Sequence, residues 1–410
     1  MDDAQIVRVG WLFDGSGEPP LRHAELRMED GLIAGIASGE DPAPPASGTP
    51  VELSHAVICP PFIDCHVHLA FSGTTDPRTR AELAEASYQA IRPVVRRHLE
   101  DLFRHGVLAV RDAGDKSGHG LRCAAEQDPQ DAAVTVLSAG CAIHRQGRYG
   151  AMIGRSPAEG ADPADFWQLQ ESSAALLKLV NSGPNSLREF GRETAPQFTV
   201  EEMARLVAKA GRAGLRVMVH ANGREPVRTA IAAGCHSIEH GYFMGRDNLQ
   251  RMAEKGVFLV PTLFAMKACA MLAGDPRERK IAEKTLAHQL EQVALARELG
   301  VKVALGTDSG SPGVLHGEAV VEELKLLIAA GYPLAGAVRC ATSAAAELLG
   351  LDRGRLFVGR PADFLVARGT PAQLPRKFSY LEGIWLAGRP SPRYRKNPQK
   401  GMASDAVATR

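Results

Sequence analysis

The 410-residue sequence lacks a long hydrophobic run and an excess of charge of either sign. No apolar stretch approaches the roughly 20 residues that a membrane-spanning helix needs, and the N-terminal Met-Asp-Asp-Ala-Gln is more acidic and polar than a secretory signal. Lysine plus arginine (48) nearly balance aspartate plus glutamate (47), and the net charge of +1 gives no argument for binding nucleic acid or an anionic membrane. We therefore expect a cytoplasmic protein with no nucleic-acid or membrane partner.

Paired cysteines are also missing. The seven cysteines form no CxxC pair, and an odd number argues against a complete disulfide framework. We expect free thiols in a reducing compartment. With 45% hydrophobic residues, the composition is that of an ordinary globular enzyme or binding protein, and the chain is long enough to bury one large core.

Both ends of the chain are predicted to be rich in β-structure. Short strand-like segments separated by Asp-Gly turns occupy residues 6–36, and a similar pattern returns at residues 354–367. Chain ends often lie close together, so we predict one small β-sandwich domain from residues 1–56 and 354–395. The Arg-, Lys- and Pro-rich residues 396–410 are expected to form a mobile tail.

Between these ends, short apolar strands alternate with longer helical stretches. Thr199 and Glu202 have the spacing of a capping box that opens a helix, and residues 276–299 and 318–330 each precede a glycine suited to ending a helix. This alternation predicts an α/β fold, a (β/α)8 TIM barrel over residues 57–353. The eight predicted strands are residues 57–64, 107–111, 134–137, 175–180, 215–219, 237–239, 257–260 and 301–306.

The strongest local motif is Phe-Ile-Asp-Cys-His-Val-His, which ends at residue 68. Alternate residues of a strand face the same way, so His66 and His68 are predicted to point together at the C-terminal end of the first barrel strand. Barrel enzymes keep their chemistry at that end, and two imidazoles on one face suit zinc or a similar ion. Taken alone, the pair is equally consistent with two histidines on a turn.

Further ligand-type residues follow later strands. His220 closes Leu-Arg-Val-Met-Val-His, His240 closes Ser-Ile-Glu-His, and Asp308 follows Val-Ala-Leu-Gly-Thr. A single histidine there would more often be a hydrogen-bonded core residue. Because all these strand ends meet at one rim, we expect the four histidines and the aspartate to converge on a metal site.

Lys178 lies inside Ala-Leu-Leu-Lys-Leu-Val, a strand that is otherwise apolar. Burying an ammonium group without a partner is costly and lowers its pKa. The strand alone favours a lysine that reaches an acidic neighbour or solvent. The alternative is a neutral amine that reacts with carbon dioxide to form a carbamate, an anion able to bridge two cations.

The order HxH, strand lysine, histidine, histidine, aspartate resembles the amidohydrolase superfamily, and more narrowly its imidazolonepropionase-like and prolidase-type (Xaa-Pro dipeptidase-like) branch. One departure is Pro184 after Ser-Gly, where relatives often have another glycine, and this leaves the loop after the fourth strand open. The resembling segments are residues 58–68, 177–183, 219–222, 237–241, 304–309 and 354–366.

The resemblance implies a metal set residue by residue. His66, His68 and Asp308 would hold the more buried of two divalent ions, which we expect to be Zn²⁺. His220 and His240 would hold the more exposed ion. Carboxylated Lys178 would bridge the two ions.

The implied activity is hydrolysis of a small amide by a metal-bridging hydroxide, with Asp308 transferring the proton to the leaving amine. His144 and Tyr242 are the further candidate catalytic residues, and Arg145 or Arg148 would clamp a substrate carboxylate, although either arginine equally fits a solvated basic loop. We expect an Xaa-Pro dipeptide or an N-acyl amino acid as substrate.

Two alternatives stay open. The same metals could serve hydrolysis of a lactone, carbamate or cyclic amide, or deamination, because fold and metal site do not decide the substrate. A non-catalytic barrel scaffold would be favoured by missing ligands, yet all six are present. We expect a small-molecule substrate as partner and a homo-oligomeric assembly.

Overall fold

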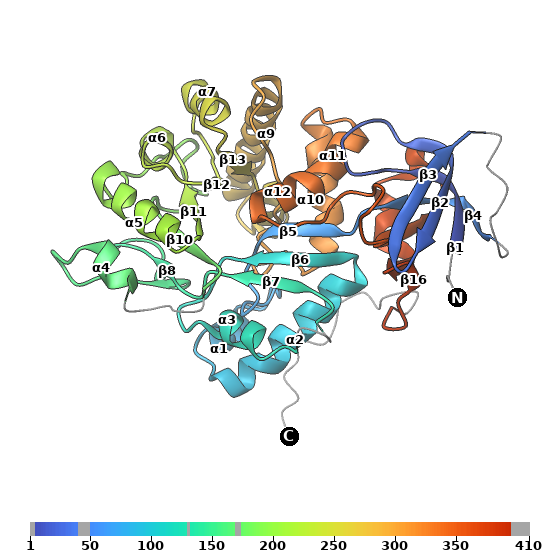
Figure 1. Ribbon diagram of the computed structural model, residues 1–410. Helices are drawn as coiled ribbons and strands as arrows, with labels where there is room; N and C mark the ends of the chain where they lie inside the picture. The colour runs from blue at the N-terminus through green and yellow to red at the C-terminus, as the bar shows by residue number, and fades with distance from the viewer. Residues whose placement is uncertain (1–4, 40–49, 129–131, 169–173, 395–410) are drawn as a thin grey trace.

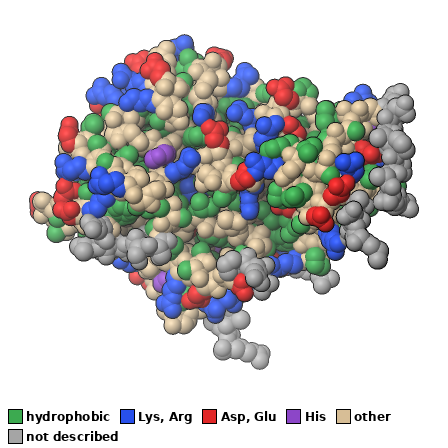
Figure 2. All heavy atoms as spheres, in the orientation of Figure 1, with side chains coloured by type: hydrophobic (Ala, Val, Ile, Leu, Met, Phe, Trp, Pro, Cys, Tyr) green, Lys and Arg blue, Asp and Glu red, His purple; other side chains and the backbone are tan. Residues whose placement is uncertain are grey.

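Three β-sheets surrounded by helices make up the residues that the computed structural model describes, which are 5–39, 50–128, 132–168 and 174–394. The seven-stranded sheet lies at one side of the molecule, and the two parallel sheets lie among the helices (Figure 1). The predicted α/β class is confirmed. On the face shown in Figure 2, basic and acidic side chains are interspersed, as the balanced composition suggests.

The seven-stranded sheet joins the two ends of the chain. Its order is β16-β15-β14-β4-β1-β2-β3, and β4 pairs parallel with β1 and antiparallel with β14. The structure has this single sheet where the sequence predicted a β-sandwich. Its strands are β1 (Gln5–Leu12), β2 (Leu21–Glu29), β3 (Leu32–Ser38), β4 (Val51–Cys59), β14 (Phe364–Arg368), β15 (Leu381–Leu386) and β16 (Arg389–Pro390).

Apolar side chains of this sheet form a core of their own. Val7, Leu26 and Ile58 are fully buried in it, and the ring of Phe364 stacks on Trp385 with centroids 5.1 Å apart. Buried residues come in runs along these strands: the last four residues of β4 and the first four of β14 are all buried. Because successive side chains point to opposite faces, this part of the sheet is covered on both faces.

The remaining strands pair in parallel, as the alternation of strands and helices predicts. The three-stranded sheet has the order β5-β6-β7, and the six-stranded sheet has the order β13-β12-β11-β10-β8-β9. These strands are β5 (Phe62–Val67), β6 (Val107–Asp112), β7 (Thr135–Ser138), β8 (Ala142–Ile143), β9 (Gly154–Arg155), β10 (Leu176–Val180), β11 (Arg216–Ala221), β12 (Ser237–His240) and β13 (Phe258–Val260).

Two strand predictions need correction. Residues 57–64 are not one strand, because Pro60 and Pro61 separate β4 from β5; proline lacks the N–H that a continuous ladder needs. Residues 301–306 form no full strand, and only Val303 makes a parallel bridge, to Leu259.

Backbone hydrogen bonds link the two parallel sheets directly on one side, where Ala175 N, just before β10, donates to Ser138 O of β7 at 2.9 Å. On the other side the link runs through residues 301–306: Cys65 N of β5 donates to Leu305 O at 2.9 Å, and Val303 bridges to Leu259 of β13. The strands nevertheless form two separate sheets, and their closure into an eight-stranded barrel stays a prediction.

Helices cover the outer side of the parallel strands. Helices α2 and α3 pack on the three-stranded sheet, and α5 and α6 pack on β11 (Figure 1). The predicted capping box is confirmed: Glu202 N donates to Thr199 Oγ1, and Thr199 N donates to the Glu202 carboxylate. No helix of the described ranges is both long and apolar enough to span a bilayer. The helices are α1 (Pro77–Ala84), α2 (Tyr88–Arg104), α3 (His119–Ala125), α4 (Pro163–Gln168), α5 (Val200–Arg212), α6 (Arg224–Ala232), α7 (Arg246–Lys255), α8 (Leu263–Leu272), α9 (Pro276–Glu298), α10 (Glu318–Ala329), α11 (Leu334–Cys340) and α12 (Ser343–Leu349), with 3₁₀ turns η1 (Pro371–Gln373) and η2 (Arg376–Tyr380).

The stacked pair in the seven-stranded sheet allows a test of its core. Phe364→Ala should lower the free energy of unfolding by about 3–5 kcal/mol, because it removes a fully buried ring and leaves a cavity. Val358, 57% exposed, is the control, and Val358→Ala should change stability by less than about 0.5 kcal/mol. Urea unfolding followed by circular dichroism measures both, and equal losses would contradict this packing.

Candidate metal centre

The ends of the parallel strands bring the predicted ligands together. His66 lies in β5, His220 in β11, and His240 ends β12. Their rings form a chain: the centroids of His66 and His240 are 5.0 Å apart, and those of His220 and His240 are 4.7 Å apart. The His68 ring lies 5.5 Å from that of His66.

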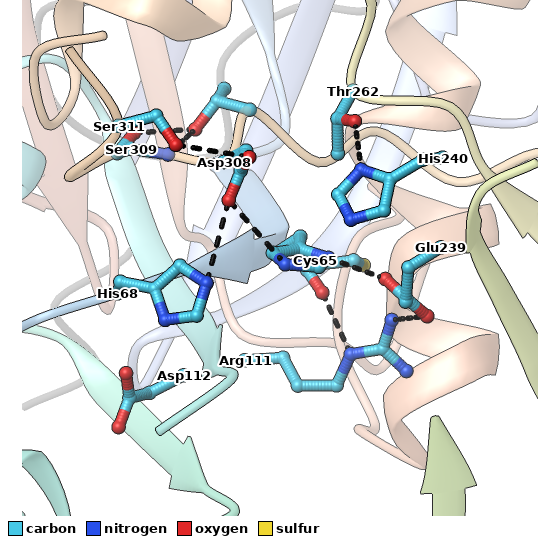
Figure 3. A network of polar contacts seen from close by, with 12 residues as sticks. Cys65, His68, Arg111, Asp112, Glu239, His240, Thr262, Asp308, Ser309 and Ser311 are labelled. Carbon is cyan, nitrogen blue, oxygen red and sulfur yellow. Dashed lines mark hydrogen bonds and ion pairs between the residues drawn. The ribbon is translucent and has the colours of Figure 1, made fainter. Parts of the chain in front are cut away.

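His66, His68 and Asp308 form the tightest group, with one ligand atom of each lying within 4.8 Å of the others. Asp308 Oδ1 lies 3.5 Å from His66 Nε2 and 3.5 Å from His68 Nε2. Figure 3 shows the Asp308 carboxylate directed at the His68 ring. The Asp308 backbone has a φ of +60°, which is unusual for a residue with a side chain, and its N–H donates to His66 O at 2.7 Å.

Three of the imidazoles are oriented through Nδ1. His66 Nδ1 lies 2.7 Å from Glu239 Oε2, His68 Nδ1 lies 2.8 Å from Gly114 O, and His240 Nδ1 lies 2.6 Å from Thr262 Oγ1. Partners of this kind fix the ring and leave Nε2 as the ligand atom, the arrangement that metal-binding histidines have. His220 differs, since its Nε2 lies 3.1 Å from Gly183 O.

Burial keeps these imidazoles neutral. Desolvation lowers the pKa of His68 to about 4 and that of His220 to about 3, and it also depresses the pKa of His66 and His240. The nearby Lys178 ammonium adds to each shift. Neutral imidazole is the form that binds metal, so the donor set fits a divalent cation at neutral pH.

Lys178 lies on β10 with its side chain inside the same rim, and it is only 1% exposed. It makes no hydrogen bond or ion pair with any residue in the described ranges. The ion-paired or solvent-reaching lysine that the strand alone favours is therefore not observed. Desolvation lowers the pKa of Lys178 to about 8, which makes the neutral, nucleophilic amine accessible.

A buried ion pair behind His66 was not anticipated from the sequence. Arg111 Nη2 donates to Glu239 Oε1 at 2.8 Å, and Arg111 Nε donates to Cys65 O at 2.7 Å (Figure 3). Both side chains are almost fully buried. The available signal was a charged residue in each of two short predicted strands, Arg111 after Val-Leu-Ala-Val and Glu239 in Ser-Ile-Glu-His, since burial demands a partner for each charge.

Two further buried carboxylates position the chain around the ligands. Asp64 accepts from Thr307 Oγ1 at 2.5 Å, and Asp112 accepts from Leu69 N at 3.0 Å. Burial raises the pKa of Asp64 to about 7 and that of Asp112 to about 6. Each therefore holds a segment next to a predicted ligand.

The predicted substrate loop lies close to the metal cluster, although its arginines are engaged. His144 is buried, with Nδ1 2.8 Å from Arg145 O. Arg145 forms an ion pair with Glu202, and Arg148 Nη2 donates to Ala195 O at 2.8 Å. Tyr149 was not singled out from the sequence, yet its ring lies 5.3 Å from that of His220.

Tyr242 follows His240 as predicted, but its ring is 3% exposed and packs among apolar side chains that include Met266 and Ala270. Desolvation raises the pKa of its phenol well above the usual value. Its catalytic role stays a prediction.

Comparison with known proteins explains this arrangement. The amidohydrolase family pattern matches residues 57–395. The chain belongs to the amidohydrolase family. This confirms the resemblance, and this amidohydrolase is thus a hydrolase that acts on carbon–nitrogen bonds of the amide type.

Individual relatives of this amidohydrolase are distant in sequence but similar in length. It is 27% identical to an ochratoxinase from Aspergillus niger, over 94% of this chain and 86% of the relative. It is also 27% identical to an imidazolonepropionase from Cupriavidus taiwanensis, over 88% of this chain and 89% of that relative. The crystal structure of a Xaa-Pro dipeptidase with bound methionine superposes with a TM-score of 0.78 at 24% identity, over 95% of this chain and 100% of that one, which shows a shared fold.

The ion pair behind His66 gives a prediction about the amidohydrolase. Glu239→Ala leaves the buried Arg111 charge uncompensated, which should cost about 3–5 kcal/mol of unfolding free energy. It also releases His66 Nδ1, which should weaken zinc affinity roughly 10- to 100-fold. Urea unfolding and zinc titration against a competing chelator measure the two effects.

The control is Glu100→Ala, which removes a glutamate whose side chain is 60% exposed in its pair with Arg104. Exposed pairs contribute little, so both measurements should stay close to wild type. A Glu239→Ala protein that behaved like the Glu100 variant would contradict a positioning role for the buried pair.

Proposed function

We propose that this protein is a binuclear metal-dependent amidohydrolase that cleaves the amide bond of a small substrate, an N-acyl amino acid or an Xaa-Pro dipeptide. The observation that carries the proposal is the cluster of His66, His68 and Asp308, whose ligand atoms lie within 4.8 Å of one another. The rings of His220 and His240 continue this cluster. The relatives' names, a Xaa-Pro dipeptidase among them, support an amide substrate.

Two divalent ions, with Zn²⁺ as our expectation, fit this donor set. His66, His68 and Asp308 would hold one ion, and His220 and His240 the other. Lys178, carboxylated on its neutral amine, would bridge the two. Ions bound there polarise a substrate carbonyl and lower the pKa of a water molecule toward neutrality.

We propose that Asp308 moves the proton. Its Oδ1 faces the imidazoles, and its Oδ2 accepts from Ser311 Oγ at 3.0 Å. Burial raises the pKa of Asp308 to about 6, close to the neutral pH at which a proton must be both accepted and released. In our proposal Asp308 takes a proton from the attacking water and delivers it to the leaving amine, while buried His144 contacts the substrate carbonyl.

We also propose the larger organisation that would hold this site. The two parallel sheets would close into one (β/α)8 barrel, supported by the backbone bonds at Ala175 and Cys65. The chain ends, residues 1–56 and 354–395, would form a separate small β domain, which the shared seven-stranded sheet supports. The seven free cysteines support a reducing compartment, and a homo-oligomer remains our expectation.

Metal content tests the proposed centre. Purified protein supplied with zinc should bind about two equivalents per chain, and His66→Ala should lower that number because one ligand set is lost. Elemental analysis after gel filtration measures it. No bound metal after supplementation would instead favour the non-catalytic scaffold.

Turnover tests the role of Asp308. With metal loaded, Asp308→Asn should keep an oxygen ligand but lose the proton acceptor, and kcat on N-acyl amino acids or Xaa-Pro dipeptides should fall roughly 100- to 10,000-fold. Asp275→Asn is the matched control, since Asp275 caps α9 away from the cluster and asparagine caps a helix equally well. Near-normal kcat in a fully loaded Asp308→Asn protein would rule out this proton transfer.

A further inference from the structure

A hollow of about 460 Å³ opens beside the candidate metal centre, between α1 and the loop at residues 151–152. Its volume lies within the range of small-molecule pockets. Phe71, Leu83 and Ala84 give it an apolar wall. Phe71 also contacts the metal cluster, because its ring lies 5.4 Å from that of His68.

Arg80 of α1 is the cationic group in this wall whose charge is not paired. Its Nη1 donates to two backbone carbonyls, Ser72 O and Gly310 O, the second at 2.9 Å. These bonds fix the guanidinium against the segment that follows Asp308. Its Nε and Nη2 make no hydrogen bond with any residue in the described ranges.

No carboxylate among the described residues forms an ion pair with Arg80. The other cation of the wall, Lys116, is already paired with Glu85 at 2.6 Å. Arg80 is partly buried, and desolvation lowers its pKa. The Asp308 carboxylate attracts the guanidinium only from beyond ion-pair distance. A partly buried guanidinium with free donors and no carboxylate in contact is stabilised when a planar anion binds it.

We propose that Arg80 binds the carboxylate of the substrate and that the apolar group beside that carboxylate occupies the hollow. This inference deepens the proposed function and rests on it, since it makes N-acylated apolar amino acids the substrate class. It also assigns the carboxylate to Arg80 in place of Arg145, whose guanidinium is already neutralised by Glu202.

A binding experiment tests the proposal without any bond being cleaved. The probes are 4-phenylbutyrate and 4-phenylbutanol, which share an apolar body and differ in the carboxylate. Calorimetry on the metal-loaded protein should show tighter binding of the carboxylate. Arg80→Met should lower affinity for 4-phenylbutyrate roughly 10- to 100-fold and leave 4-phenylbutanol unchanged.

Matched variants separate recognition from structure. Arg78→Met, two residues earlier on α1 at a side chain 88% exposed, should keep the wild-type preference. Arg80→Lys keeps the positive charge but loses the two parallel N–H donors of the guanidinium. Its affinity for 4-phenylbutyrate should therefore lie between those of wild type and Arg80→Met. Should Arg80→Met fail to fold, the lower affinity of Arg80→Lys for 4-phenylbutyrate, with unchanged affinity for 4-phenylbutanol, tests the role of the guanidinium. Ala84→Trp, which fills the hollow, should weaken both probes.

Three results would overturn the proposal: a wild-type protein that does not prefer the carboxylate, a preference that survives Arg80→Met, or a preference lost in an Arg145→Ala/Arg148→Ala protein instead. If the role of Arg80 were purely structural, Arg80→Met would lower the affinity for both probes alike. In turnover, Arg80→Met should raise KM for N-acetyl-L-phenylalanine and spare its carboxamide. Absence of any hydrolysis by wild type would count against the proposed function alone, because the binding result does not depend on it.

Discussion

Arg111 and Glu239 form a buried ion pair that joins β6 to β12, and the second carboxylate oxygen of Glu239 contacts His66 Nδ1. Removing two charges from water costs several kcal/mol each, and only close, fully hydrogen-bonded geometry offsets that cost. Arg111 meets this requirement by donating also to Cys65 O and Ser237 Oγ. The pair also fixes geometry, because any other position of His66 would leave the buried Glu239 Oε2 without its hydrogen bond to His66 Nδ1.

The same constraint extends to residues that are not ligands. Asp64 accepts hydrogen bonds from Thr307, next to Asp308, and Asp112 accepts one from Leu69, next to His68. Buried carboxylates thus fix the segments that present the ligands. Desolvation lowers the pKa of the buried Lys178 and favours its uncharged amine, and the attraction of Glu239 and Asp308 offsets only part of that effect.

The sequence predicted features that depend on local spacing. The period of a strand places His66 and His68 together, and the helix after Thr199 follows from its capping box. It did not predict features that depend on register between distant strands. Arg111 and Glu239 are 128 residues apart, and nothing in either strand indicates which other strand supplies its partner. Residues 301–306 illustrate a second limit. The apolar run there predicts a strand, but it does not determine how many of its residues pair with a neighbouring strand, and only Val303 does so.

The arginines that we expected or propose to bind the substrate illustrate the same limit of prediction from sequence. A basic, glycine-bearing loop made Arg145 a natural candidate for an anion clamp, but a guanidinium attracts a ligand only when the protein has not already neutralised it. Glu202 lies in the first turn of α5 and pairs with Arg145, whereas the guanidinium of Arg80 contacts backbone carbonyls and lies in a largely apolar wall, with no carboxylate of the described residues within ion-pair distance. In our proposal, specificity therefore depends on which cation near the candidate metal centre lacks an ion-paired carboxylate, and that is decided by tertiary packing.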